Sequence, residues 1–472
     1  MRKGFFWLIF LPFLVNAQKI RSLEDCFRMA ELNNLTILQM KNQVELRNIE
    51  VKEAFDNMLP SLTAGGRASW NYGLTQNLTT GILENQTVFG NTWFIGVDMP
   101  LFRGFLLQKN KQLAELNRLL SEYQLEKTRQ DIRANIATAY LQILMNAENL
   151  RSLQAQKKST EKQVEKMQAL VKAGARPLSD LKDLEAQLAQ DKLNVVQAQN
   201  ALQMAKLSLA RMLESKDITS FEIDTVTAHF PVDKTLELKT PEQLFNQYLN
   251  ENPSYLSAQT GLQISEKQIE RARSGFYPSI NLSGSWNTRF MDRERVAGVE
   301  PDPNNPYRVI GITETTHERV LAPNMRYIMG PPEPYFDQLN KNAGFSFGIS
   351  LSIPVFNRFT ARRQVEKARI NAMNARIELE NTRKQFRATV YKLHTDLRNA
   401  KHKLIAAEKN REAARIAYRY ALEKLEAGVI NPYDLDNIKA RKIKAENQYI
   451  TAKYEYLFKL KLLELSLKNS KQ

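Results

Sequence analysis

The chain is built from one structural unit used twice, and this duplication limits its possible folds more than any local motif does. One set of residues recurs about 218 positions later: Glu24, Phe27, Asn34 and Pro60-Ser61 return as Glu242, Phe245, Asn252 and Pro278-Ser279. A second set recurs about 254 positions later: Pro100, Phe102, Gly174, Asp180 and Leu181 return as Pro354, Phe356, Gly428, Asp434 and Leu435. The offset grows between the two strands of the second unit, so an enlarged loop lies there.

Each unit is predicted to form a short helix, two strands of alternating apolar and polar residues, and two very long helices. We expect the first structural repeat at 18–239, with strands at about 61–73 and 91–101 and long helices at about 103–172 and 178–214. The second repeat is expected at 240–472, with strands at about 279–289 and 344–356 and long helices at about 358–426 and 432–468. The predicted class is mainly α with a strand part, formed by a duplicated β-β-α-α unit.

Residues 1–17 have the features of a secretory signal peptide. Basic residues at Arg2 and Lys3 precede an apolar run at 4–15, and Ala17 supplies a small residue at the cleavage site. The apolar run is too short to cross the roughly 30 Å hydrocarbon core of a bilayer. The single cysteine, Cys26, is expected to be a small buried side chain on the first helix.

The formal net charge of +16 could suggest nucleic acid as a partner. From Asn357 to the end, however, 27 Lys and Arg stand against 13 Asp and Glu, so the excess belongs almost wholly to the last two helices. There the charges are mixed with acids, without interleaved aromatic platforms. This pattern, behind an export signal, argues against nucleic-acid binding and favours a polar duct or anionic partners.

The four strand segments alternate between an apolar and a small polar face, as half-buried strands do. In the clearest one, Phe345, Phe347, Ile349 and Leu351 face one way and serines and glycines the other. Ten residues suffice for a tilted strand to cross a bilayer, although a sheet in a soluble domain would show the same pattern. Four strands cannot close a barrel, so the chain must oligomerise. Two copies would supply eight strands and a filled interior, whereas three supply twelve and leave a lumen.

The long helices show coiled-coil spacing. Between 103 and 172 there is no proline and only one glycine, so a helix of roughly 100 Å is expected. The following helix has a three-four pattern of apolar residues that only Asp191 interrupts. A soluble two-helix coiled coil would explain the heptads but not the strands or the duplication.

Both helix pairs turn at a glycine followed by a proline, which ends one helix and starts the next. The turn residues are Gly174, Arg176 and Pro177 in the first repeat and Gly428, Asn431 and Pro432 in the second. Carboxylates follow each turn: Asp180 and Asp183, then Asp434 and Asp436. They can complement the helix dipole, and in a ring of subunits they can also form an acidic constriction.

Taken together, these features resemble the TolC-like outer membrane efflux proteins, and the resemblance covers nearly all of the mature chain. The residues that carry it are the junctions Met99-Pro100-Leu101-Phe102 and Ile353-Pro354-Val355-Phe356, the strand entries Leu59-Pro60-Ser61 and Tyr277-Pro278-Ser279, and the two glycine turns. The resemblance implies a homotrimer in the outer membrane, with a twelve-stranded barrel that continues into a helical barrel through the periplasm.

The resemblance also implies partners and site residues. The helix turns would face a periplasmic adaptor (a membrane fusion protein) that links the duct to an inner-membrane pump of the RND or ABC type. Asp434 falls on an acidic constriction position, but Asn437 stands where a second aspartate would be expected, with Asp436 beside it. The proline-rich loop at about 292–342 departs from the family pattern, and its topology places it on the external side.

The sequence predicts no enzyme, cofactor or metal site, because its four histidines have no metal spacing and no phosphate loop or nucleophile motif occurs. The leading hypothesis is a passive gated exit duct for small molecules in a tripartite efflux system. An alternative is the same duct in type I protein secretion. A third is a periplasmic coiled-coil structural protein that never inserts into the membrane.

Overall fold

The computed structural model describes residues 22–76, 81, 83–215, 222–223, 232–430 and 432–467. The expected signal peptide lies outside the described residues. The described residues divide into two compact units. The helical unit falls within Met1–Glu50, Leu113–Glu266 and Arg369–Gln472, and the strand unit falls within Val51–Gln112 and Lys267–Ala368. Both sequence repeats contribute to both units, so the repeats are not separate domains.

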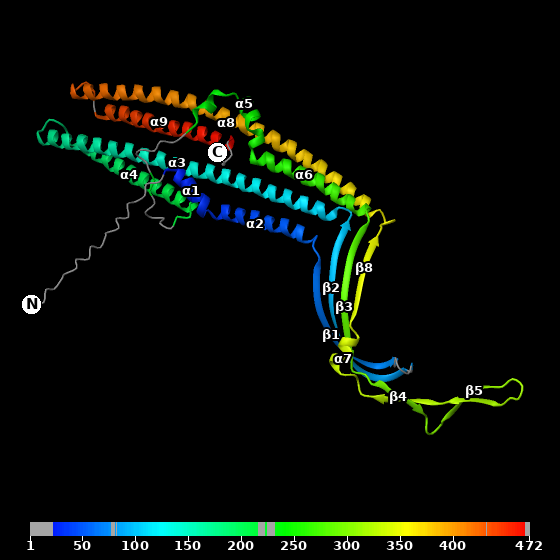
Figure 1. Cartoon of the computed structure of the whole chain (residues 1–472). Coiled ribbons are helices and arrows are strands. Elements are labelled where there is room, and N and C mark those ends of the chain that lie inside the picture. Colours follow the sequence, from blue (N-terminus) through cyan, green and yellow to red (C-terminus); the bar gives the residue numbers. More distant parts are fainter. Residues whose placement is uncertain are drawn as a thin grey trace, which may run out of the picture. The chain divides into compact units, whose positions relative to one another are not determined.

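In the helical unit, each repeat packs a short helix against a long antiparallel pair (Figure 1). The first repeat contains α1 (Leu23–Asn33), α2 (Leu35–Asp56), α3 (Leu106–Lys172) and α4 (Leu178–Met212). The second contains α5 (Pro241–Tyr248), α6 (Pro253–Arg273), α8 (Thr360–Glu426) and α9 (Pro432–Leu467). α2, α3, α6 and α8 continue into the strand unit. Among the described residues, no helix is long and apolar enough to cross a membrane.

The repeated residues have the same local roles in both halves. Asn34 accepts a hydrogen bond from the Thr36 N–H at 3.0 Å, and Asn252 accepts one from the Tyr255 N–H at 3.1 Å, so each asparagine caps the following helix. Capping boxes start α1 at Ser22 and α5 at Thr240. Cys26 is fully buried on α1, as expected.

Two apolar cores reflect the duplication. The first joins α1, α3 and α4 through buried residues such as Cys26, Ile136 and Leu209. The second joins α5, α8 and α9 through Phe245, Val390 and Leu460 and their neighbours. Phe27 packs at the edge of the first core, whereas Phe245 is buried within the second. Fully burying one such side chain contributes about 1.5–3 kcal/mol, so these cores anchor the long helices.

In the strand unit, four antiparallel strands form one sheet in the order β1-β2-β3-β8 (Figure 1). The strands are β1 (Ser61–Gln76), β2 (Leu83–Arg103), β3 (Ser279–Met291) and β8 (Gly344–Ser352). β2 begins eight residues before the expected position, and β8 ends at Ser352, before Pro354. Proline cannot donate to a strand ladder, so β8 ends before Pro354, whereas β2 continues past Pro100 with a register shift between Pro100 and Phe102.

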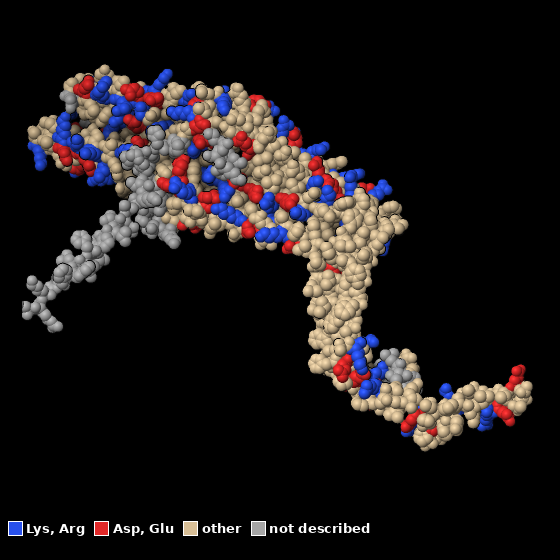
Figure 2. Space-filling view, in the orientation of Figure 1, with Lys and Arg blue, Asp and Glu red and all other residues tan. Residues whose placement is uncertain are grey.

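The register confirms that the sheet has one apolar face. Leu62 lies opposite Val97, Val97 opposite Gly284, and Gly284 opposite Phe347, so these residues share one side. Most large residues on this side are exposed in the single chain. The part of the sheet visible in Figure 2 carries almost no Lys, Arg, Asp or Glu. Phe94 is an exception on the polar side, where its ring covers Gly65.

Residues 292–342, which we expected to be a loop, contain further paired strands. β4 (Arg295–Pro301) pairs with β7 (Met325–Gly330), and β5 (Tyr307–Ile312) pairs with β6 (Arg319–Pro323). α7 (Tyr335–Lys341) then returns the chain to β3, and the Tyr335 hydroxyl accepts from Trp93 Nε1 of the neighbouring strand β2 at 2.9 Å. Many prolines suggested irregular structure, but they lie at strand ends and between strands, where no ladder N–H is lost.

Candidate functional site

The helix turns of both repeats have the same backbone geometry. Gly174 and Gly428 both have φ of +73°, the left-handed conformation that favours glycine. The Gly174 N–H donates to the Val171 carbonyl at 3.0 Å, and the Gly428 N–H donates to the Leu425 carbonyl at 3.0 Å. Each turn therefore satisfies the last carbonyls of a 67-residue helix and reverses the chain.

The expected turn residues lie at the starts of the second helices. Pro177 is the N-cap of α4, and its side chain makes no capping bond. The Arg176 guanidinium lies 3.9 Å from the Asp180 carboxylate. In the second repeat α9 begins at Pro432, whereas Asn431 lies outside the described residues.

The four expected carboxylates are placed differently from one another. Asp180 and Asp434 lie in the first turns of α4 and α9, where negative charge complements the helix dipole. Asp183 and Asp434 are exposed, and Asp436 is half-buried. In this position both first-turn aspartates can stabilise their helix through its dipole, which is one of the two roles expected for these acids.

Asp436 occupies the most unusual environment of the four. Burial raises the pKa of its carboxyl group, and the negative charges of Asp191 and Asp183 raise it further, whereas Lys439 lowers it. The structure thus brings Asp183 of the first repeat near Asp436 of the second. Asp436, Asp191 and Lys439 therefore lie where water is partly excluded, and the exposed Asp183 adds its charge to theirs.

A buried polar cluster lies beside Asp436 and joins three helices. Thr160 of α3, Asp191 of α4 and Lys439 of α9 are 0%, 4% and 3% exposed. Lys439 Nζ donates to Thr160 Oγ1 at 2.9 Å, and Thr160 Oγ1 donates to Asp191 Oδ2 at 2.5 Å. Gln187 Nε2 also donates to Asp191, at 3.0 Å. The cluster therefore links α9 of the second repeat to both long helices of the first.

The opposite charges within the cluster offset the free-energy cost of burying each of them. Burial lowers the pKa of the Lys439 ammonium group, while the carboxylates of Asp191 and Asp436 raise it. A buried charge without partners costs several kcal/mol, so each charged member depends on the others. Sequence reasoning missed Lys439, since one lysine among many carries no signal. Asp191 did give a signal, because it interrupts an apolar heptad seam.

A cavity of about 360 Å³ lies at the same end of the helical unit. Its walls combine apolar side chains with charged and polar ones, and they come from both repeats. The lining residues are Gln163, Lys166, Met167, Leu170, Ala175, Arg176, Leu184, Leu425, Leu435 and Asp436. Arg176 and Asp436, both expected from the sequence, therefore line one cavity.

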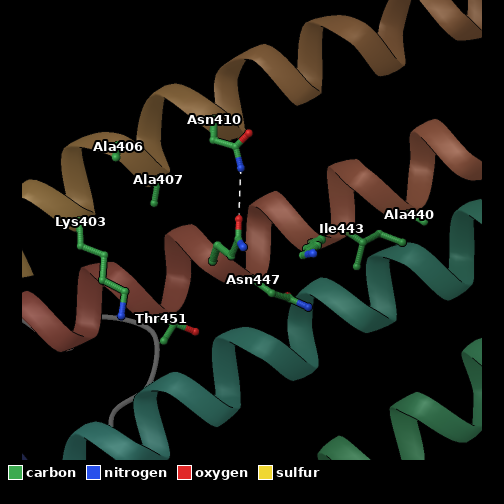
Figure 3. A pocket seen from close by; sticks show the side chains of 10 residues that line it. Lys403, Ala406, Ala407, Asn410, Ala440, Ile443, Asn447 and Thr451 are labelled. Carbon is green, nitrogen blue, oxygen red and sulfur yellow. Dashed lines mark hydrogen bonds between the residues drawn. The ribbon is translucent and has the colours of Figure 1, made fainter.

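A second hollow, of about 860 Å³, lies between α8 and α9 (Figure 3). Alanines from both helices line it, at Ala406, Ala407 and Ala440, together with Lys403 and Lys444. Asn410 Nδ2 donates to Gln448 Oε1 across the hollow at 3.1 Å. Small side chains of this kind let another helix approach closely. Among the described residues, no cluster of three potential metal ligands occurs.

The long paired helices, the sheet with one apolar face and the glycine turns define an outer-membrane channel fold. The family model for outer membrane efflux proteins matches residues 27–214 and 244–467, so the chain belongs to this family. This is a family of outer-membrane channels rather than of enzymes, and the similar proteins include channels of efflux and of protein secretion.

Individual relatives agree with this assignment. The outer membrane protein TolC of Salmonella enteritidis is 22% identical over 449 residues, which are 92% of this chain and 79% of that protein. The alkaline protease secretion protein AprF of Pseudomonas aeruginosa is 20% identical over 82% of this chain and 72% of its own length. The crystal structure of VceC from Vibrio cholerae superposes with a TM-score of 0.72 at 14% identity, covering 95% of this chain and 97% of that one.

Proposed function

We propose that three copies of this chain form a gated exit duct through the outer membrane. The observation that carries the proposal is the sheet, whose outer strands β1 and β8 each pair on one side only in the described part of the chain. Unpaired strand edges cannot lie in lipid, and four strands cannot close on themselves. Twelve strands from three copies would pair every edge and turn the apolar faces outward to lipid.

The helical unit supports the same assembly. The alanine-lined hollow between α8 and α9 suits a helix of a neighbouring copy, because small side chains allow close packing. α8 also exposes large apolar side chains in the single chain, among them Ile370, Met373 and Ile377. Packing between copies would cover these side chains and continue the duct along the long helices.

We propose that Asp180, Asp183, Asp434 and Asp436 form an acidic aperture at the turn end of this duct. A threefold axis would bring twelve carboxylates together there. Such a ring attracts cations and disfavours anions. The half-buried position of Asp436 next to the Thr160, Asp191 and Lys439 cluster would couple the aperture to the packing of α9.

We further propose that the turns at Gly174, Arg176, Pro177, Gly428, Asn431 and Pro432 face a periplasmic adaptor. The adaptor would connect the duct to an inner-membrane pump of the RND or ABC type. The chain itself would be passive and catalyse no reaction, so the energy for expelling small molecules would come from the pump.

Type I protein secretion is a second candidate, favoured by the similarity to AprF. Deletion of the gene distinguishes efflux from protein secretion. Efflux predicts greater sensitivity to small toxic molecules with an unchanged set of secreted proteins, whereas secretion predicts the loss of a particular exported protein. The third hypothesis, a coiled coil that never inserts, is not supported, because the family consists of outer-membrane channels.

The proposal is tested by purifying the full chain in detergent. We expect a mass of three copies by light scattering and stepwise ion conductance in planar bilayers. Monomers that conduct no ions, or release of the protein from membranes by carbonate, would contradict it.

A further inference from the structure

Residues 295–330, here called the arm, form a long hairpin that the proposed duct does not use. β4 and β7 form its base, and β5 and β6 form its end (Figure 1). Asn324 joins the two parts, because its N–H donates to the Pro306 carbonyl at 2.9 Å and its carbonyl accepts from the Asp302 N–H at 2.8 Å. The tip is closed by the Thr313 N–H, which donates to the Glu318 carbonyl at 2.9 Å.

The base of the arm has two different faces. Cross-strand partners in an antiparallel pair share a face, so the register assigns each residue to a side. One face carries the ion pair of Glu300 and Arg326, together with Arg295, which pairs with Glu333 at 3.2 Å. The opposite face has no charge, and it is formed by the pairs Val296–Met329, Val299–Tyr327 and Pro301–Met325.

This uncharged face, here called the apolar arm face, is open in the single chain. Val299 is 50% exposed, Tyr327 53% and Met325 48%. A two-stranded hairpin is at best marginally stable in water, and in the described chain the closest partners of β4 and β7 are each other. A contiguous exposed apolar surface of this kind marks a site of interaction with a protein or a membrane.

We propose that the apolar arm face packs against the arm of a neighbouring copy of this chain. Two observations favour a second copy over another occupant. The arm begins four residues after β3 ends, and in the proposed duct the sheet that contains β3 pairs with other copies, so identical arms would emerge at the same end of the assembly. In addition, the charges at the base pair with one another on the opposite face, which leaves no charge on the apolar arm face to select a charged partner.

The arms would form a second contact between copies, separate from the sheet edges and the helices. This inference depends on the trimer of the proposed function but adds a surface that the channel fold does not require. The distal pair β5·β6 offers further apolar surface, because Val309 and Leu321 lie opposite each other and are 50% and 54% exposed.

The test uses the full chain in outer membranes. A photoreactive phenylalanine derivative replaces Tyr327 on the apolar arm face, and in a matched control it replaces Ile328 on the opposite face. After illumination we expect adducts of two or three chains from position 327 and at most traces from position 328. Adducts with lipid, adducts with a different protein, or no adducts at position 327 would overturn the proposal.

A second measurement tests the arm contact independently of the other contacts between copies. Tyr327→Glu should lower the temperature at which the purified trimer dissociates, whereas Ile328→Glu should leave it unchanged. The mass of the particle is measured in parallel. A wild-type trimer with equal effects of the two substitutions would refute only the arm contact, whereas a wild-type monomer would refute the proposed duct.

Discussion

At the scale of single residues, the most informative group is Lys439 with Thr160 and Asp191. Its members come from three helices, and the bond from Lys439 to Thr160 spans 279 positions in the chain. Buried polar groups of this kind can fix the register of packed helices, since a shifted register leaves them without partners. We infer that the cluster aligns α9 with α3 and α4.

Replacing the lysine tests this inference. Lys439→Met should destabilise the protein by about 3 kcal/mol, because it leaves the Asp191 carboxylate buried without the nearby cation. The double variant Lys439→Met with Asp191→Leu should regain most of that loss, since neither charge remains buried. Chemical denaturation of the purified protein measures both changes. A double variant as unstable as the single one would contradict the inference.

The environment of Asp436 predicts that the stability of the folded chain depends on pH. Its pKa is raised in the folded chain, so the folded state holds the proton more tightly than the unfolded state does. Stability is then lost as pH rises from the ordinary value of about 4 through the raised value. Asp436→Asn should therefore be more stable than the parent protein at neutral pH and equal to it below about pH 4. Thermal unfolding across this range checks the prediction, and Asp434→Asn, on the exposed first turn, is the control.

At the scale of elements, the junctions between strands and long helices repeat an unusual backbone conformation. Gly104 and Phe105 have φ of +59° and +65°, and Arg358 and Phe359 have φ of +54° and +60°. In each junction two phenylalanine rings meet edge to face, at 5.1 Å between Phe102 and Phe105 in the first repeat. Two successive left-handed residues turn the chain sharply just before each long helix begins, at Leu106 in α3 and at Thr360 in α8.

The first junction should tolerate no side chain at Gly104. A Cβ there would lie 2.6 Å from the Ser274 carbonyl oxygen, which is backbone and cannot move aside easily. Gly104→Ala should lower stability by more than about 1 kcal/mol. Gly261→Ala is the matched control, because that glycine lies inside α6 with open space around it and should gain up to about 1 kcal/mol. Thermal unfolding compares the two variants.

At the scale of the whole molecule, the conducting particle is predicted to be cation-sensitive at one end. The carboxylates of Asp180, Asp183, Asp434 and Asp436 would stand closest to the axis of the trimer. The local negative charge comes from these four positions in each copy, although the chain as a whole is strongly basic.

Replacing all four aspartates by asparagine should weaken block by multivalent cations and increase the leak of the closed duct. The reason is that fixed negative charge holds cations in the aperture. Single-channel recordings with a trivalent cation added to the turn side measure the effect. Unchanged block would mean that these residues act only at the helix starts, through the dipole.

Several features could be predicted from the sequence because they depend on neighbouring residues. Alternation along Phe345–Leu351 identified a strand with one apolar face, and the register of the sheet confirms that face. The glycines at 174 and 428 predicted the helix turns, since only the local backbone decides where a left-handed residue is needed. The family resemblance followed from the spacing of such local features and is confirmed.

Only the tertiary structure decided which distant residues meet. Asp191 was visible as a break in a heptad, but its partner Lys439 could be found only once α9 was packed against α3 and α4. Likewise, the pairing of β4 with β7 could not be read from a proline-rich segment, because strand pairing depends on contacts across many residues of chain. Local periodicity thus determined the elements, while burial and long-range pairing determined the polar cluster, the half-buried Asp436 and the arm.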